Sequence, residues 1–434
     1  MKPDTPGCPF VGGREFDPQQ IDQVINPHPW LAAARREAPV FYMPKHDQWC
    51  VTRYEDVLAV LKDTETFSSQ RVIEPRMLPG FETLPFGHPV AKNLINTDPP
   101  EHIRLRKLAQ RAFTPRMVAS YEADTRDLAE RLVDGFAQAG STDLVQEFTR
   151  ALVFEMMALT IGIPSEKVED FRRYEQALLA TLTSAPQLPP DEEHRVAQEV
   201  IAFGKWLVEF IEDRRRDPQD DFTSQLIQAE GDDGTPSLTT VEVLRVVHST
   251  LTAGVDTTAS AMATSVYLLL QDRSHWDAIQ KDPSLIPTMV EECLRFEGPV
   301  RGVRRDVTRD TVVGEVAIPA GATLYVSYAS AQRDDAVFTD PDVFDPERDD
   351  VSQHFAFGKW THFCLGAALA RMELKVALEV LSARLPTLRL AEDPGPDVIP
   401  TMLGCFLTSL RVVWDPETAI AVGPARPTPV HIER

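Results

Sequence analysis

The feature that most constrains the fold of this chain is a cysteine that follows a glycine- and aromatic-containing loop. Residues 354–372 read His-Phe-Ala-Phe-Gly-Lys-Trp-Thr-His-Phe-Cys-Leu-Gly-Ala-Ala-Leu-Ala-Arg-Met, with the cysteine at Cys364. Apolar side chains then recur at helical spacing as far as Val380, and Pro386 ends the pattern. The cysteine therefore lies at the start of a predicted helix, where unpaired N–H groups and the helix dipole favour a thiolate.

A thiolate in this place is suited to be a nucleophile or a metal ligand. Zinc needs several Cys or His ligands at suitable spacing, and His362 is only two residues from Cys364. A haem iron, in contrast, takes a single axial thiolate. A buried structural cysteine, the commoner role of a free thiol, remains open on this loop alone.

The loop resembles the haem-ligand loop of the cytochrome P450 family. Phe357-Gly358-x-x-x-His362-x-Cys364-x-Gly366 places the aromatic, glycine, histidine and cysteine positions in the family's register. The resemblance implies a bound haem b (iron protoporphyrin IX), with Cys364 as the metal ligand and the other four residues in the cofactor site.

One position departs from the family pattern. Trp360 stands where the family usually has a second glycine. Because a Cβ disfavours backbone conformations that glycine permits, we expect a locally altered loop, with the indole on the electron-donor side of the haem. Lys107 and Lys359 are candidates for positive charge near it.

Composition indicates the class of protein and of partner. The net charge of −22 argues against nucleic acid, which selects a basic face. Five widely spaced cysteines do not form a disulfide pattern, and no stretch has the length of a signal or a membrane span, so we expect a cytoplasmic protein without a membrane partner.

The periodicity predicts a mainly α fold with small β-sheets (α+β) in one domain over residues 1–434. Residues 1–20 read as an irregular arm, residues 40–42 and 48–53 as strands, 54–61 as a helix and 312–319 as a hairpin. The resemblance implies a single-domain cytochrome P450 fold, with the haem between a long distal helix and the helix after the cysteine.

The longest helical run begins at residue 237 and continues to about residue 271. Thr239 and Glu242 fit a capping box at its start. Its middle, residues 252–261, has no large side chain, and Gly254 there costs about 1 kcal/mol relative to alanine. Close packing of helices through small residues is one explanation, although it does not account for an acid followed by a hydroxyl.

Ala253-Gly254-x-Asp256-Thr257 resembles the oxygen-binding groove of the same family. The resemblance implies that Ala253 and Gly254 border the cofactor. It also implies that Asp256 and Thr257 are catalytic, with Thr257 donating a hydrogen bond and Asp256 relaying protons from solvent.

Three cationic or imidazole side chains are candidates for holding the haem propionates. His102 and Arg106 lie on one face of a helix that begins near residue 99, which without the resemblance reads as a basic solvent face. Arg305 follows in a later strand, with Arg304 as the alternative if the register slips by one residue. A further set, Glu292, Arg295 and Arg348, resembles the family's structural triad, and we assign it to folding.

The substrate cavity is placed by resemblance alone, and its candidate lining residues are Phe81, Phe86, Leu251, Arg301, Val303, Met402 and Phe406. Arg301 is unusual beside an apolar cavity, because a buried guanidinium is costly without an acceptor. Its partner is either a haem propionate or a polar or anionic end of the substrate, for which Gly302 leaves room.

These features together predict a haem-thiolate monooxygenase of the soluble bacterial type. It inserts one oxygen atom from O2 into a hydrophobic small molecule, with electrons from a separate ferredoxin or flavodoxin. Two alternatives are a peroxide-driven or rearranging haem-thiolate enzyme and a haem-based sensor or ligand-binding protein. Turnover with NAD(P)H, reductase and ferredoxin separates the three.

Overall fold

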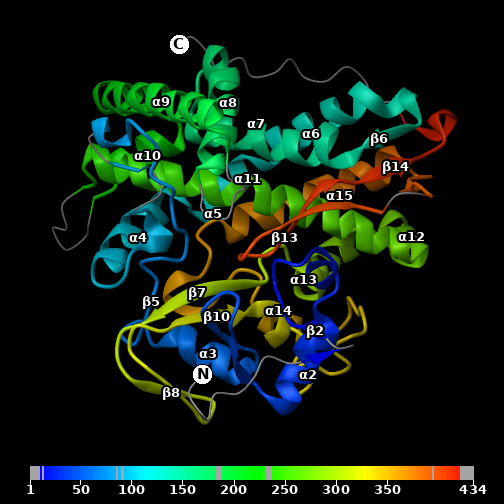
Figure 1. The fold of residues 1–434 in the computed structure, drawn as a ribbon. Coiled ribbons are helices and arrows are strands. Elements are labelled where there is room, and N and C mark those ends of the chain that lie inside the picture. The colour runs from blue at the N-terminus through cyan, green and yellow to red at the C-terminus, as the bar shows by residue number, and fades with distance from the viewer. Residues whose placement is uncertain are drawn as a thin grey trace.

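A long helix, α11 (Thr240–Gln271), runs through the middle of the molecule (Figure 1). The computed structural model describes residues 10–420 apart from 12–13, 85–86, 89–91, 182–187, 231–236 and 393–394. Thr239 accepts a hydrogen bond from the backbone of Glu242, whose side chain bonds back to the backbone of Thr239. The predicted capping box and length of this helix are confirmed.

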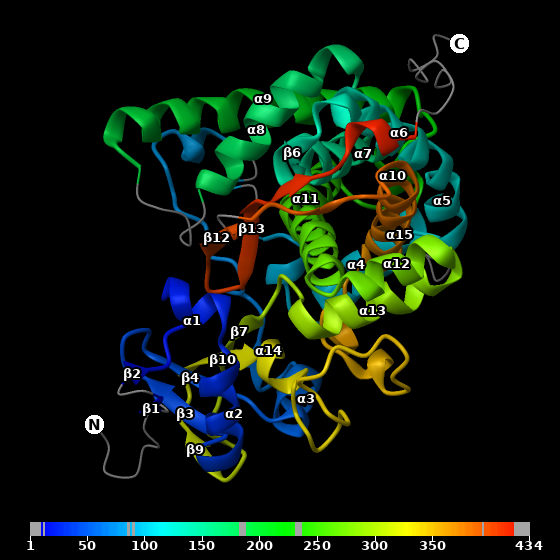
Figure 2. The same ribbon diagram turned by 90° about the vertical axis from the view of Figure 1, so that its right-hand side faces the viewer.

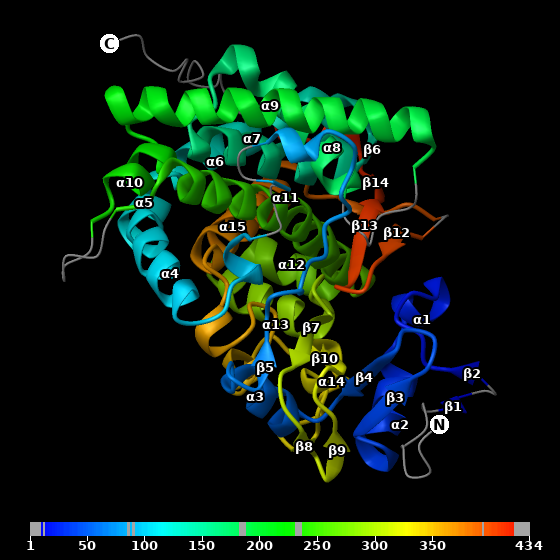
Figure 3. The ribbon, with the colours of Figure 1, turned by 60° about the vertical axis from the view of Figure 1, so that its left-hand side comes forward.

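Helices cover α11 on the side away from the main sheet (Figures 1 and 3). They are α6 (Glu122–Phe136), α7 (Arg150–Ile161), α8 (Val168–Ala180) and α9 (Pro190–Arg216). The helix after the cysteine loop, α15 (Ala367–Arg384), packs against both α6 and α11.

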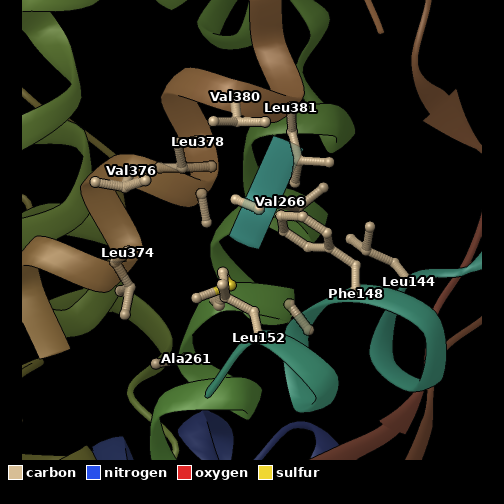
Figure 4. Close-up of a cluster of buried hydrophobic side chains, with 14 of the residues drawn as sticks. Leu144, Phe148, Leu152, Ala261, Val266, Leu374, Val376, Leu378, Val380 and Leu381 are labelled. Carbon is tan, nitrogen blue, oxygen red and sulfur yellow. The ribbon is translucent and has the colours of Figure 1, made fainter. Parts of the chain in front are cut away.

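The largest apolar core lies between α7, α11 and α15 (Figure 4). Phe148 and Leu152 reach it from the start of α7 and the turn before it, Val266 from α11, and Leu378 from α15. Each of these side chains is buried, and a buried side chain of this size contributes about 1.5–3 kcal/mol by its removal from water. This packing fixes the long helix relative to the cysteine loop.

The main sheet has five strands in the order β3-β4-β10-β7-β5. They are β3 (Val40–Met43), β4 (Gln48–Val51), β5 (Phe67–Ser68), β7 (Gly302–Val307) and β10 (Thr323–Ser327). Only the β4–β10 pair within this sheet is parallel. The strands predicted at 40–42 and 48–53 are confirmed, as is the helix after them, α3 (Tyr54–Lys62).

A second hairpin, β12 (Asp397–Pro400) and β13 (Cys405–Ser409), lies beside α11 and the short α1 (Ile21–Ile25), as Figure 2 shows. The predicted hairpin at 312–319 is present as β8 (Thr311–Val313) and β9 (Val316–Ile318). The N-terminal arm differs from the prediction, because β1 (Phe10–Val11) pairs with β2 (Arg14–Glu15).

The remaining elements complete the chain between these landmarks. They are α2 (His28–Glu37), α4 (Glu101–Ala112), α5 (Pro115–Ser120), β6 (Ser141–Asp143), α10 (Phe222–Gln228), α12 (Arg273–Lys281), α13 (Ile286–Glu297), α14 (Tyr328–Ala331), β11 (Arg389–Leu390) and β14 (Arg411–Val413). Within the described part of the chain, every helix is too short or too polar to cross a membrane.

A buried charge network joins α13 to the loop before the cysteine. Glu292 accepts two hydrogen bonds from Arg295, at 2.7 and 2.8 Å, and one from Nε of Arg348 at 3.1 Å. Glu292 and Arg295 are both 0% exposed. Arg295 also donates to the backbone carbonyls of Gln332 and Pro341, so one side chain holds several segments together.

We therefore expect Glu292→Gln to lower the free energy of unfolding by about 3–5 kcal/mol, because it leaves two buried guanidinium groups without a full counter-charge. Urea denaturation followed by circular dichroism measures the change. The matched control is Glu347→Gln, an exposed glutamate in the same loop, which should change stability by less than about 0.5 kcal/mol. Equal stabilities of the two variants would assign no structural role to the network.

Candidate active site

Cys364 is held in a tight loop three residues before the start of α15. Its backbone N–H donates to the carbonyl of Phe357 at 2.8 Å, and Gly358 lies between them with a φ of 66°. This positive φ explains why glycine occupies that position. Gly366 is the N-cap of α15, so the loop passes directly into the helix.

The Cys364 side chain is exposed, although protein surrounds it. Burial raises the pKa of the thiol above its usual value, while the backbone N–H of Gly366 and the guanidinium groups of Arg106 and Arg371 act in the opposite direction. The helix start was expected to favour the thiolate, but burial is the larger effect here. Because the Cys364 side chain is solvent-accessible although protein surrounds it, it faces an internal space.

Two imidazoles lie together on one side of this loop. The ring centroids of His102, on α4, and His362 are 4.1 Å apart. Neither ring nitrogen of His102 has a hydrogen-bond partner among the described residues, although its side chain is only 1% exposed, and Nε2 of His362 is likewise without one. Burial and nearby positive charge lower the pKa of His102 to about 4 and that of His362 to about 2.

Two arginines add positive charge to the same place. Arg305 is 5% exposed, and its Nη1 donates to the carbonyl of Arg304 at 2.7 Å. No ion pair joins Arg305 to another described residue. Arg304 instead pairs with Glu74 at 3.0 Å and Asp306 at 3.2 Å, so the strand register turns Arg305 toward the imidazoles.

The residues present fit a haem. Buried polar groups without a partner are costly, and the ring nitrogens of His102 and Nε2 of His362 have no hydrogen-bond acceptor among the described residues, although the charge of Asp98 acts on His102 and Arg305. The two propionates of a haem would provide acceptors for them, and Cys364 would provide one thiolate for the iron. His102 and His362 lie together, Arg106 and Arg305 act on His362, and Arg106 also acts on Cys364. Their assignment to the propionates stays a prediction.

The distal group lies on α11. Ala253 is exposed although it stands near the middle of this central helix, which indicates an internal space on that face. Thr257 donates its hydroxyl hydrogen to the carbonyl of Ala253 one turn earlier, and Asp256 accepts from Arg150. Leu365, next to the cysteine, packs against the apolar cluster that contains Leu251 of α11.

Gly254 has a different role from the one expected. A Cβ added to it would lie 2.3 Å from the terminal methyl carbon of Met157 on α7. That atom is the flexible end of a side chain, so the contact shows that α7 packs on α11 at this position but does not show that glycine is required there. The assignment of Gly254 to the cofactor stays a prediction.

Sequence reasoning missed Arg150 and Glu175, which surround Asp256. Arg150 begins α7 and donates to both carboxylates. Glu175 follows Tyr174 on α8, between apolar positions of the buried face, and is 2% exposed. An acid at helical spacing with Phe171 and Leu178 was the available signal.

Arg301 already has partners within the protein. It pairs with Glu297 at 2.6 Å and also donates to the carbonyl of Val24. The space beside Gly302 is filled, because a Cβ there would meet the ring of Tyr325 at 2.4 Å. Both proposed partners of Arg301, the propionate and the substrate, are thus replaced by protein groups.

The other substrate candidates occupy several environments. Phe81, Leu251 and Val303 are buried in apolar clusters, whereas Met402 and Phe406, at the β12–β13 hairpin, are half-buried. Phe86 lies outside the described residues. Lining of the substrate cavity by these residues stays a prediction.

Trp360 keeps the backbone conformation that glycine would adopt. Its φ is 57°, so the loop accepts a side chain at a left-handed position, at a cost of order 1–3 kcal/mol. The expected alteration of the loop, and the place of the indole and of Lys107 and Lys359 on the electron-donor side, stay predictions. The indole is 52% exposed, and Nζ of Lys62 lies 5.4 Å from its ring centroid.

Comparison with known proteins gives one family. The model of the family "Cytochrome P450" matches residues 26–402. Nocardicin C N-oxygenase of Nocardia uniformis subsp. tsuyamanensis is 39% identical, over 95% of this chain and 99% of the relative. Mycinamicin IV hydroxylase/epoxidase of Micromonospora griseorubida is 37% identical, over 79% of this chain and 83% of the relative.

Among solved structures, cytochrome P450 CYP109Q5 from Chondromyces apiculatus superposes with a TM-score of 0.83 at 32% identity, over 94% of this chain and 99% of that one. The fold, the cysteine loop and these relatives agree. The chain belongs to the cytochrome P450 family and is a cytochrome P450 monooxygenase.

Proposed function

We propose that the protein inserts one oxygen atom from O2 into a hydrophobic small molecule, with electrons from a separate ferredoxin or flavodoxin. The observation that carries this proposal is the joint presence of two groups. The unpartnered imidazoles of His102 and His362 lie together near Cys364 with Arg106 and Arg305, and an acid and an alcohol stand in sequence on α11.

When bound, haem b supplies the binding and cleavage of O2 that no side chain provides. The chain's own residues bind and orient it. Cys364 donates the thiolate, while His102, Arg106, Arg305 and His362 supply donors for the propionates.

Thr257 and Asp256, on the α11 side of the haem site, deliver protons to it. The Thr257 hydroxyl donates to the Ala253 carbonyl, which fixes its orientation, and its lone pairs can accept hydrogen bonds from solvent donors. Asp256 has a carboxylate that is 30% exposed, so it can exchange protons with solvent and pass them toward Thr257.

The names of the relatives suggest the kind of substrate. One is named for N-oxygenation of nocardicin C and another for hydroxylation or epoxidation of mycinamicin IV. Nitrogen as well as carbon is therefore a candidate site of oxygen insertion, in a molecule of the kind made by antibiotic-producing bacteria. Compounds that shift the Soret band of the ferric protein toward high spin identify the substrate.

We expect the reduced protein with carbon monoxide to show the far-red-shifted Soret band of a thiolate-ligated haem. Cys364→His should abolish this band, because an imidazole donates less electron density to the iron than a thiolate does. Cys405→Ser, at a buried cysteine in β13, is the control and should keep it. Retention of the band in Cys364→Ser would exclude Cys364 as the ligand.

We expect Thr257→Ala to retain haem and to divert reducing equivalents into hydrogen peroxide. A positioned general acid contributes roughly 10²–10⁴-fold, and the variant loses part of this. Assays with a surrogate reductase and ferredoxin measure peroxide per NADPH oxidised. Thr250→Ala is the control, because its hydroxyl donates to the Val246 carbonyl in the same way two turns earlier. If the two variants produce equal peroxide, Thr257 has no part in proton delivery.

A further inference from the structure

One guanidinium serves two carboxylates at the distal side of the site. Nη2 of Arg150 donates to both oxygens of Glu175, at 3.0 and 2.9 Å, and its Nη1 donates to Asp256. The three side chains come from different helices, α7, α8 and α11. When both acids are ionised, the cluster carries one negative charge in excess.

The two carboxylates differ in their access to water. The side chain of Glu175 is 3% exposed and that of Asp256 is 30% exposed. Burial raises the pKa of Glu175 to about 7, the charge of Arg150 opposes this, and the charge of Asp256 adds to it. The folded protein therefore keeps a proton on Glu175 up to about pH 7, well above the usual range of a glutamate.

Few other charges act on Glu175. On its own helix, Arg172 lowers its pKa, with a smaller effect than Arg150. From α9, Glu199 lies 3.9 Å from Arg173, and before α8, Lys167 pairs with Asp170 at 2.9 Å. These groups are engaged with one another, so Arg150 and Asp256 dominate.

We propose that Glu175 is a positioning residue for proton delivery, because it competes with Asp256 for the guanidinium of Arg150; this rests on the function proposed above. A neutral Glu175 leaves the full charge of Arg150 to Asp256, which is then held against α7. An ionised Glu175, having released its proton to solvent, takes a share of that charge. Asp256 is then less tightly held and turns more readily between solvent and Thr257.

The first test is independent of turnover and uses the haem-containing protein. Infrared difference spectra between pH values detect the carbonyl stretch of a buried neutral carboxylic acid. We expect a band that disappears as the pH rises through about 7, and that is absent in Glu175→Gln. Glu373 on α15, whose pKa burial raises to about 8, gives an internal reference that remains in the variant.

The second test measures peroxide per NADPH oxidised, without substrate, as a function of pH. In the wild type this ratio should fall as the pH rises through about 7, because Asp256 is released. Glu175→Gln mimics the neutral acid, so it should keep the low-pH ratio of the wild type at every pH. Glu175→Asp should restore the pH dependence, and Glu147→Gln, an exposed glutamate just before α7, should behave as the wild type.

The two tests fail differently. An infrared band assigned to Glu175 together with identical peroxide profiles for wild type and Glu175→Gln would overturn the positioning role and leave the monooxygenase function intact. The positioning role would also be overturned if the Glu175→Gln variant kept every carbonyl band of the wild type, because Glu175 would then be ionised at every pH measured. Failure of the carbon monoxide spectrum would instead refute the function on which the inference rests.

Discussion

The cost of burying polar groups without partners is the physical constraint on which the site depends. His102 and Arg305 are almost fully buried, yet the described protein gives them few acceptors. Such groups lose their hydration and gain nothing in exchange unless an anion meets them. The same donors would provide affinity and orientation for the carboxylates of the cofactor.

In this molecule the buried charges of the structural network are paired within the protein, whereas the buried arginine of the candidate site is not. Glu292, Arg295 and Arg348 are as deeply buried as Arg305, but their charges and hydrogen bonds are satisfied by one another and by backbone carbonyls. Arg301 belongs with the first group, since Glu297 and the Val24 carbonyl satisfy it. All of these arginines are buried, so burial does not distinguish the structural arginines from those of the cofactor site. The presence or absence of a charged partner within the protein does distinguish them.

The sequence predicted the long helix and its capping box, the strands near residues 40–51 and the helix after them, because local spacing carries that information. It could not predict the partners of Arg301 or the packing of Gly254 on Met157, since these contacts join segments distant along the chain. Residues whose role depends on a long-range neighbour are those that pattern reading misses.

Asp256 shows why such neighbours matter to function. Its place beside Thr257 is set by the local turn of α11, but the charge that holds it comes from α7, and the competitor for that charge comes from α8. Apolar packing among α7, α8 and α11 fixes the three backbones, which leaves the side-chain charges as the adjustable part. A change that moves α8 relative to α7 alters the distance between Glu175 and Arg150, and therefore the hold on Asp256. Proton delivery is in this way connected to the position of a helix that contributes no atom to the acid–alcohol pair.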